Sequence, residues 1–302
     1  MEIRTGLSRP RWDSLIGDQP VSLQQDWCYG AAMETLGAQI IRAELGPSDN
    51  PLALAQITTR KLGGMLTLAL TLRGPVWRGD VSDGDKRAVY RTLKSRLGLG
   101  WPRITLFSPD ETETTGTQGL ARVTTGYSTV MLDLQPDLDA LRKGFNGKWR
   151  NRLVAAEKSD LKIQVNGTKP AQYLWLLETE DGQRQARGYR ATPGELVPAF
   201  VEAKGDRNSL LILRADLGKQ KAAAMLFLIH GRAATYHIGW SSDEGRKLGA
   251  HNLLLWSALG ALKDRGVTQL DLGGVNTQSG AGIARFKIGT GGQVVTYSGS
   301  WT

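Results

Sequence analysis

The stretch YHIGWSSDEGRKLGAHNLLLWSALGALKDRGVTQLDLGG, residues 236–274, holds the most regular pattern in the chain. Side chains along residues 233–240, which overlap the start of this stretch, alternate in direction and predict a strand. A helix is predicted over 247–264, and Gly266 ends it. Its apolar stripe includes Leu248, Leu255, Leu259 and Leu262. A second strand over 267–272 follows, and this strand–helix–strand order indicates an α/β domain.

Outside this stretch the sequence patterns alternate between hairpins and helices. Strands are predicted over 39–45, 52–60, 64–72, 103–107, 127–134, 162–166, 209–215 and 221–230, with a last strand near 293–298. Helices are predicted over 22–36, with Ser22 as N-cap, and over 83–97, 136–145, 147–158, 170–181, 194–203 and 281–288. Hairpins this frequent exclude a doubly wound parallel sheet. The fold class is therefore α/β with mixed, largely antiparallel sheets.

The two halves of the chain repeat a similar order of helix, antiparallel strands, helix and strand. A chain of 302 residues is long enough for two domains. The join is placed near 135–150, where Gly144 and Gly147 separate two helices. We expect one domain over 1–145 and a second, which carries the active site, over 146–302.

Positive charge is concentrated at this join. The chain has 38 Lys and Arg against 29 Asp and Glu, a formal net charge of +9. No acidic residue lies between Asp139 and Glu157. That window contains Arg142, Lys143, Lys148, Arg150 and Arg152. Such a block suits phosphate contacts, with Trp149 as a stacking face. The alternative is a solvated helix face with Trp149 packed inward.

The sequence lacks the motifs of several common kinds of catalytic, cofactor and metal site. The single cysteine, Cys28, excludes an internal disulfide, and no P-loop, dinucleotide fingerprint or GxSxG motif occurs. His230, His237 and His251 lack zinc-site spacing. We therefore expect no metal and no tightly bound cofactor. The longest apolar runs are about eight residues, whereas a membrane span needs about 20. A cytoplasmic protein without a membrane span is the expectation.

The segment RKLGAH, Arg246 to His251, stands directly before the most regular helix. It is similar to the [QR]xxGx[GA] loop of GNAT acyltransferases, where backbone N–H groups at a helix N-terminus hold a pyrophosphate. Arg246, Gly249 and Ala250 match that loop. His251 replaces a small residue and is expected to crowd a pyrophosphate.

Motifs along the chain resemble the Fem-type (FemABX-like) peptidoglycan-bridge aminoacyltransferases and the BioF2-like acyltransferases of the GNAT superfamily. The C-terminal matches are a Y-x-x-G-x-S strand, a tryptophan in the helix, a D-x-G-G turn and an F-K-x-G-x-G-G segment. They fall on Tyr236, Gly239, Ser241, Trp256, Asp271, Gly273, Gly274, Phe286, Lys287, Gly289, Gly291 and Gly292. Upstream matches fall on Gln25, Trp27, the Arg73-Gly74-Pro75 turn, Trp149 to Arg152, and Arg187-Gly188-Tyr189.

The resemblance implies two tandem GNAT-like domains. Helix 22–36 has no Lys or Arg, whereas Fem proteins that extend the peptidoglycan stem often carry a lysine there. No long heptad segment exists, so the coiled-coil arm of some Fem proteins is not expected.

The resemblance also implies site residues. Lys287 corresponds to a functional lysine that stabilises an oxyanion or holds the donor, or else it snorkels from a short helix. Asp271 accepts a proton or orients Lys287, or it caps a turn. Tyr236 and His237 alternate along their strand, so one of the two faces a site. Candidate substrate-binding residues are Arg73, Trp149, Arg150, Arg152, Arg187, Tyr189, Gly239, Ser241, Arg246 and Phe286.

The resulting hypothesis is an aminoacyl-tRNA-dependent transferase that forms an amide bond on an amine-bearing small molecule, peptide or muropeptide. In this hypothesis tRNA is the partner and co-substrate. One alternative is an acyl-CoA-dependent N-acyltransferase. Another is a non-catalytic GNAT-like module that binds nucleic acid or protein.

Overall fold

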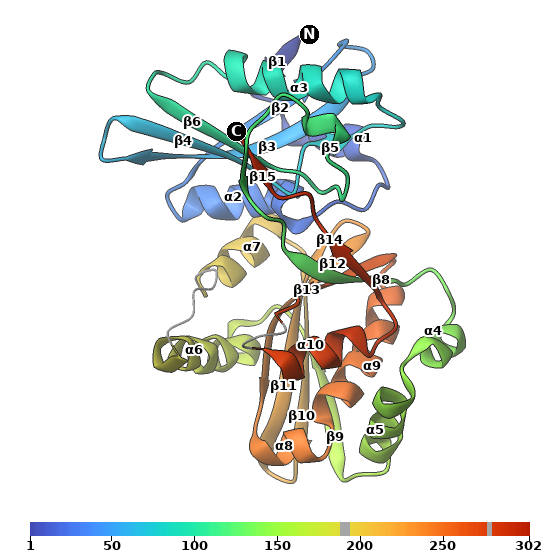
Figure 1. The fold of residues 1–302 in the computed structure, drawn as a ribbon. Coiled ribbons are helices and arrows are strands. Elements are labelled where there is room, and N and C mark those ends of the chain that lie inside the picture. The colour runs from blue at the N-terminus through green and yellow to red at the C-terminus, as the bar shows by residue number, and fades with distance from the viewer. Residues whose placement is uncertain (188–193, 277–279) are drawn as a thin grey trace. The chain divides into compact units, whose positions relative to one another are not determined.

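The computed structural model describes residues 1–187, 194–276 and 280–302 (Figure 1). Their contacts divide the chain into two compact units. Unit 1 comprises Met1–Tyr127 and Thr296–Thr302, and unit 2 comprises Ser128–Val295. The sequence placed the division at residues 145 and 146. The contacts place it at 127 and 128, because the strand that begins at Ser128 pairs within the sheet of unit 2.

Unit 1 is a mixed sheet with helices on it. Its strands are β1 (Ile3–Thr5), β2 (Gln39–Leu45), β3 (Ala53–Leu62), β4 (Leu66–Leu72), β5 (Val76–Trp77), β6 (Arg103–Ser108), β7 (Arg122–Thr124) and β15 (Ser300–Trp301). Its helices are α1 (Arg9–Ile16), α2 (Trp27–Thr35) and α3 (Asp83–Arg96), with short 3-10 turns η1 (Leu23–Gln25) and η2 (Thr115–Thr117). The strand order is β1-β2-β3-β4-β6-β15-β7, and β5 pairs with β3. Only β4 and β6 pair in parallel among these described strands.

The helix predicted over 22–36 begins later than the sequence indicated. Residues 23–25 form η1, and α2 begins at Trp27. Asp26 is the N-cap: its carboxylate accepts hydrogen bonds from the N–H groups of Cys28 (2.8 Å) and Tyr29 (3.3 Å). The prediction of Ser22 as N-cap is wrong because Asp26 can satisfy two first-turn donors, whereas the Ser22 hydroxyl donates to the Arg73 carbonyl.

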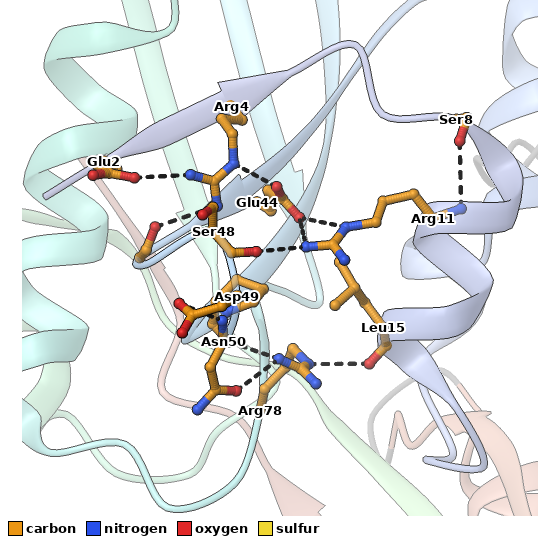
Figure 2. Close-up of polar contacts among 12 residues, drawn as sticks. Glu2, Arg4, Ser8, Arg11, Leu15, Glu44, Ser48, Asp49, Asn50 and Arg78 are labelled. Atoms are coloured by element: carbon orange, nitrogen blue, oxygen red, sulfur yellow. Dashed lines mark hydrogen bonds and ion pairs between the residues drawn. The ribbon is translucent and has the colours of Figure 1, made fainter.

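A buried carboxylate joins three elements of unit 1, as Figure 2 shows. Glu44 on β2 is 5% exposed. Arg4 of β1 donates to it through Nε at 2.5 Å, and Arg11 of α1 donates through Nε at 3.1 Å. Arg11 also bonds the carbonyl of Ser48. Two cations on one buried carboxylate satisfy its desolvated oxygens and fix β1 and α1 against β2.

Unit 2 is built on a seven-stranded sheet in the order β14-β8-β13-β12-β11-β10-β9. Its strands are β8 (Ser128–Asp133), β9 (Leu161–Asn166), β10 (Leu210–Leu217), β11 (Gln220–His230), β12 (Ala233–Ser241), β13 (Gln269–Gly274) and β14 (Gln293–Thr296). Its helices are α4 (Leu138–Gly144), α5 (Gly147–Glu157), α6 (Pro170–Arg187), α7 (Leu196–Lys204), α8 (Asp243–Lys247), α9 (Ala250–Lys263) and α10 (Ala281–Ile288).

The central helix of unit 2 is shorter than predicted. The pattern over 247–264 is divided into α8 and α9, and Gly249 stands between them at φ +72°. A residue in the left-handed conformation cannot continue a right-handed helix, and glycine adopts this conformation without strain. Leu255, Leu259 and Leu262 of the predicted stripe are fully buried in the core, where α9 packs on β10 and β11. Among the described residues no helix is long and apolar enough to cross a membrane.

The Glu44 contacts predict a stability effect. Glu44→Gln removes the charge while both arginines keep their positions, so we expect unfolding free energy to fall by about 1 to 3 kcal/mol. Glu2 pairs with the same Arg4 at 2.8 Å, but its side chain is 70% exposed. Glu2→Gln is therefore the matched control and should change stability little. Chemical denaturation followed by circular dichroism measures both; equal losses would contradict the role assigned to Glu44.

Candidate active site

Unit 2 contains a cavity of about 1030 Å³. The N-terminal part of α5, the second half of β12, the junction of α8 with α9, and α10 form its walls. Its lining includes Lys148, Arg152, Arg246 and Arg285 but no Asp or Glu among the described residues. A cavity with four cations and no carboxylate favours an anionic ligand.

The cavity opens where two strands separate. β12 and β13 pair in parallel at Ala233, Ala234 and Thr235, and their ladder ends at Thr235 with Asp271. From Tyr236 onward β12 pairs with β11 alone. His237 is the extra residue of a bulge, because Tyr236 faces Phe227 while Ile238 faces Leu226. The second edge of β12 is thereby left for a ligand.

The N-terminus of α9 forms one wall. Gly249, Ala250, His251 and Asn252 line the cavity. The backbone N–H groups of Ala250 and His251 make no hydrogen bond within the described residues, as is usual for a first helical turn. The Arg246 guanidinium is held by the Ser241 carbonyl at 3.2 Å and by the exposed carboxylate of Asp243. Unpaired N–H groups beside a fixed cation are suited to a phosphate.

Two glycines shape this loop. A Cβ on Gly245 would lie 2.1 Å from the carbonyl oxygen of Ala222, so only glycine fits there. A Cβ on Gly249 would lie 3.0 Å from Cγ of Arg152. Arg152 also donates through Nη2 to the Arg246 carbonyl. The sequence prediction that Gly249 and Arg246 belong to one loop is consistent with this arrangement.

His251 is tied to the strand beside it. Its Nε2 lies 3.0 Å from the Trp240 carbonyl oxygen and therefore carries the proton. Burial lowers the pKa of His251, so the ring is neutral at neutral pH. This hydrogen bond fixes the imidazole against β12, while the N–H groups of the first turn remain free.

Tyr236 places a phenol in the cavity. Its hydroxyl has no hydrogen-bond partner among the described residues. A Cβ on Gly239 would lie 1.7 Å from that hydroxyl, so glycine lets the phenol lie over the strand. Burial raises the pKa of Tyr236 well above its ordinary value. Tyr236 is therefore a neutral proton donor. His237 does not line the cavity, and burial lowers its pKa to about 4.

Lys287 lies behind Tyr236 and is absent from the described cavity lining. It is 7% exposed, and its Nζ donates to the Gly274 carbonyl at 2.8 Å. The same Nζ lies 5.8 Å from the centre of the Tyr236 ring. Burial lowers the pKa of Lys287 to about 8, against an opposing effect of the Asp271 carboxylate. Lys287 thus connects α10 to the end of β13 and to the phenol.

Asp271 binds its own turn. Its Oδ1 accepts hydrogen bonds from Thr129 Oγ1 at 2.5 Å and from the Gly273 N–H at 2.8 Å. Gly273 has φ +75°. These contacts match the turn-capping alternative considered for the sequence.

Trp149 joins α5 to α10. Its ring is 5% exposed, and Nε1 donates to the Phe286 carbonyl at 3.0 Å. The ring packs against Phe145 with the two centres 4.2 Å apart. A Cβ on Gly289 would lie 2.7 Å from Cδ1 of Trp149. Trp149 also lines the cavity, and its buried, paired indole matches the inward-packed alternative rather than a solvent-facing stacking surface.

The other candidates are distributed unevenly. Arg152, Ser241 and Phe286 line the cavity, whereas Arg150 bonds the Lys143 carbonyl at 3.2 Å and does not line it. Arg73 lies in unit 1, 7% exposed, with Nε 2.6 Å from Asp110 and Nη1 2.5 Å from the Tyr127 hydroxyl. Because Arg73 is buried and paired, its environment does not favour contact with a substrate anion. The Arg187 side chain and Tyr189 lie outside the described residues.

Sequence reasoning missed Asn252. It is 4% exposed, it lines the cavity in the first turn of α9, and its amide has no hydrogen-bond partner among the described residues. A buried amide without a partner is costly unless a ligand satisfies it. The visible signal was its place three residues after Gly249.

Comparisons with known proteins agree with this geometry. Residues 143–287 match the acetyltransferase (GNAT) domain family. A solved structure of FemX superposes with a TM-score of 0.80 at 14% identity, covering 100% of this chain and 96% of that chain. A tandem GNAT protein from the clavulanic acid biosynthesis pathway superposes with a TM-score of 0.54 at 12% identity, covering 99% of this chain and 98% of that chain. No curated protein sequence matches the chain.

A third solved structure is the C-terminal domain of a putative lysylphosphatidylglycerol synthetase from Agrobacterium fabrum. It gives a TM-score of 0.56 at 14% identity, covering 92% of this chain and 88% of that chain. At such identities the likenesses show the fold. The prediction of a mixed α/β fold with two tandem GNAT-like domains is confirmed, and the Fem-type resemblance is matched at the level of the fold by the likeness to FemX.

The buried ammonium of Lys287 predicts a pH effect on stability. Its pKa is about 8 in the folded chain against an ordinary 10.5, so the unfolded chain binds more protons between these values. Stability should therefore rise with pH from about 8 to about 10.5, by at most about 3 kcal/mol. The Lys287→Met variant should not show this rise in stability with pH. Denaturant unfolding over that range measures the difference, with the exposed Lys158→Met as control; parallel curves for all three proteins would refute it.

Proposed function

We propose that the chain, whose residues 143–287 match the acetyltransferase (GNAT) domain family, transfers an acyl group from an anionic donor in the cavity beside α9 to an amine. The observation that carries the proposal is the cavity lining. Four cations and the free N–H groups at the start of α9 surround a space that no carboxylate enters within the described residues. An acyl-CoA thioester, with its pyrophosphate, is the donor that this arrangement favours.

Each wall of the cavity offers a contact to such a donor. The N–H groups of Ala250 and His251, with Arg246, meet a pyrophosphate. The Asn252 amide offers a hydrogen bond to an amide of the donor's arm. The free edge of β12 from Tyr236 to Ser241 pairs with the same arm as a strand would.

The transfer itself needs a neutral amine and a proton for the leaving group. The acceptor nitrogen attacks the acyl carbon, an oxyanion forms, and the carbon–sulfur bond breaks. Tyr236, protonated because burial raises its pKa, gives its proton to the departing sulfur. The proton lost by the acceptor nitrogen returns to the phenolate through solvent. Lys287 acts as a positioning residue, because it contacts Gly274 and the Tyr236 ring rather than the cavity.

A second donor, an aminoacyl-tRNA, is supported by the rim of the cavity. Lys148, Arg152 and Arg285 line it and are exposed, so the 3′ end of an RNA finds cations beside the same pocket. The Fem-type resemblance of the sequence motifs favours this donor, and it favours an amine on a peptidoglycan precursor as acceptor. Arg142, by contrast, is occupied by a bidentate pair with Glu157 at 2.6 Å through each nitrogen.

Donor binding distinguishes the two candidates. We expect acetyl-CoA to raise the melting temperature of the chain, and Arg246→Ala to weaken this binding about tenfold by removing one phosphate contact. Lys247→Ala is the matched control: Lys247 is the next residue, is 70% exposed and does not line the cavity. Calorimetric titration measures both affinities.

If acetyl-CoA and longer acyl-CoA thioesters fail to bind while a charged tRNA binds and releases its amino acid to an added amine, the donor is the tRNA. If neither binds, the proposed function is wrong.

The phenol of Tyr236 predicts a second result. Tyr236→Phe should lower kcat about 100-fold with little change in donor affinity, because only the proton donor is lost. Gly239→Ala should have a similar effect, because its Cβ would occupy the position of the hydroxyl. Gly282→Ala is the control, since Gly282 lines the cavity and a Cβ there meets nothing within 4 Å. Mass-spectrometric assay of the amide product measures all three; full activity in Tyr236→Phe would remove Tyr236 from the mechanism.

A further inference from the structure

One end of the sheet in unit 1 exposes apolar side chains to an unusual degree. Trp101 is 86% exposed and Met65 is 80% exposed, and Leu62 and Ile104 are 43% and 41% exposed. Trp101 and Met65 are the most exposed large apolar residues of the described chain. Such clusters mark interaction sites more often than single exposed side chains do.

The register of the strands brings these residues together. Leu62 of β3 faces Leu66 of β4, and β4 pairs in parallel with β6 from Thr67 with Arg103 onward. The Thr67 N–H donates to the Pro102 carbonyl at 3.0 Å. Met65 and Trp101 each precede this pair by two residues, so they lie in the loops that lead into neighbouring strands at the same end of the sheet. We call residues 60–66 and 99–104 the sheet tip (Figure 1).

An apolar face continues inward from the sheet tip. Leu66, Leu68 and Leu70 alternate along one side of β4, and Leu68 and Leu70 face Ile104 and Leu106 of β6. All five are partly or fully exposed. The opposite side of the same strands, with Ala69 and Phe107, is fully buried in the core beneath α3. The sheet tip is therefore continuous with the side of β4 and β6 that faces away from α3, and the side chains on that side are aliphatic.

The charge around the sheet tip is positive. Residues 50–79 and 86–109 contain no Asp or Glu. The cations of this end are Arg60, Lys61, Arg91, Lys94, Arg96 and Arg103, and none of them makes an ion pair within the described residues. Arg103 bonds only the carbonyls of Leu99 and Lys94. These cations are therefore available to an anionic partner.

We propose that the sheet tip is a docking surface for an anionic lipid bilayer, in which Met65 and Trp101 enter the interface while the surrounding cations meet lipid phosphates. Tryptophan prefers the interface, and aliphatic side chains gain free energy on leaving water. Basic residues next to an apolar insertion supply the second attraction that reversible membrane binding needs. Leu62, Met65 and Ile104 offer no stacking surface to RNA, and two copies of so basic a surface repel one another.

Sedimentation with vesicles tests the proposal on the full chain. The chain should bind vesicles made of equal parts of phosphatidylcholine and phosphatidylglycerol, and it should bind pure phosphatidylcholine at least about tenfold more weakly. The double variant Met65→Ser, Trp101→Ser should lose about tenfold or more in affinity for the anionic vesicles. Val165→Ser is the matched control, because Val165 is an exposed aliphatic residue on β9, 58% exposed.

The charge contribution has its own pair of variants. Lys61→Gln should weaken vesicle binding, and raised salt should weaken it further, whereas the exposed Lys219→Gln on unit 2 should bind as the unchanged chain does. All these side chains are exposed, so the variants should keep their melting temperatures.

Three results would overturn the proposal. The first is that the chain does not bind anionic vesicles. The second is that the Met65→Ser, Trp101→Ser variant binds these vesicles as tightly as the unchanged chain. The third is that the unchanged chain forms a dimer in sedimentation equilibrium and this variant does not. The last would make the tip an interface between two copies. None of these results bears on acyl transfer, so the proposed function is tested separately.

Discussion

The hydrogen bond from the Trp149 indole to the Phe286 carbonyl fixes the distance on which the cavity of unit 2 depends. It joins α5 to α10, the two helices that carry the basic rim. Gly289 allows the indole to approach, since a Cβ there would lie 2.7 Å from Cδ1. The Asn146 N–H adds a bond to the Gly289 carbonyl at 2.8 Å. A larger residue at 289 would separate the helices and move Lys148, Arg152 and Arg285 away from one another.

The separation of β12 from β13 supplies the rest of the site. Parallel pairing ends at Thr235, and the bulge at His237 turns the strand just before Gly239. Two interactions hold β13 and α10 in place beyond that point. Asp271 closes its own turn through Thr129 and Gly273, and Lys287 reaches the Gly274 carbonyl. A buried ammonium and a half-buried carboxylate thus stabilise the loop, while the uncharged phenol of Tyr236 faces the cavity.

Gly239, Ser241, Arg246 and Phe286 were found as candidates from the sequence, because each belongs to a local motif whose geometry depends on neighbouring residues, and all four line the cavity. The burial of Trp149 and Arg73 was not predictable in the same way, because it depends on partners far along the chain. Phe286 is 137 residues from Trp149, and Tyr127 is 54 residues from Arg73. Composition predicts that an arginine is charged, but it does not reveal a distant carboxylate such as Asp110.

The same reasoning applies to the fold. The meander of β10, β11 and β12 and the stripe of α9 were predictable, because their hydrophobic periods are local. The return of the last residues to unit 1 as β15 was not, since this strand has only two residues, Ser300 and Trp301, which is too short for any hydrophobic period.

Two of the acid-free regions of the chain have different structural settings. In residues 140–156 the cations stand on α4 and α5, and two of them, Lys148 and Arg152, line a cavity that limits what can reach them. In residues 86–109 Arg96 and Arg103 precede and follow, along the chain, the loop that carries the exposed Trp101. A pocket with cations selects a phosphate by shape, whereas a flat or protruding surface with cations selects an extended anion by charge density. The net charge of +9 therefore includes two unlike features, and a change that neutralises one leaves the other intact.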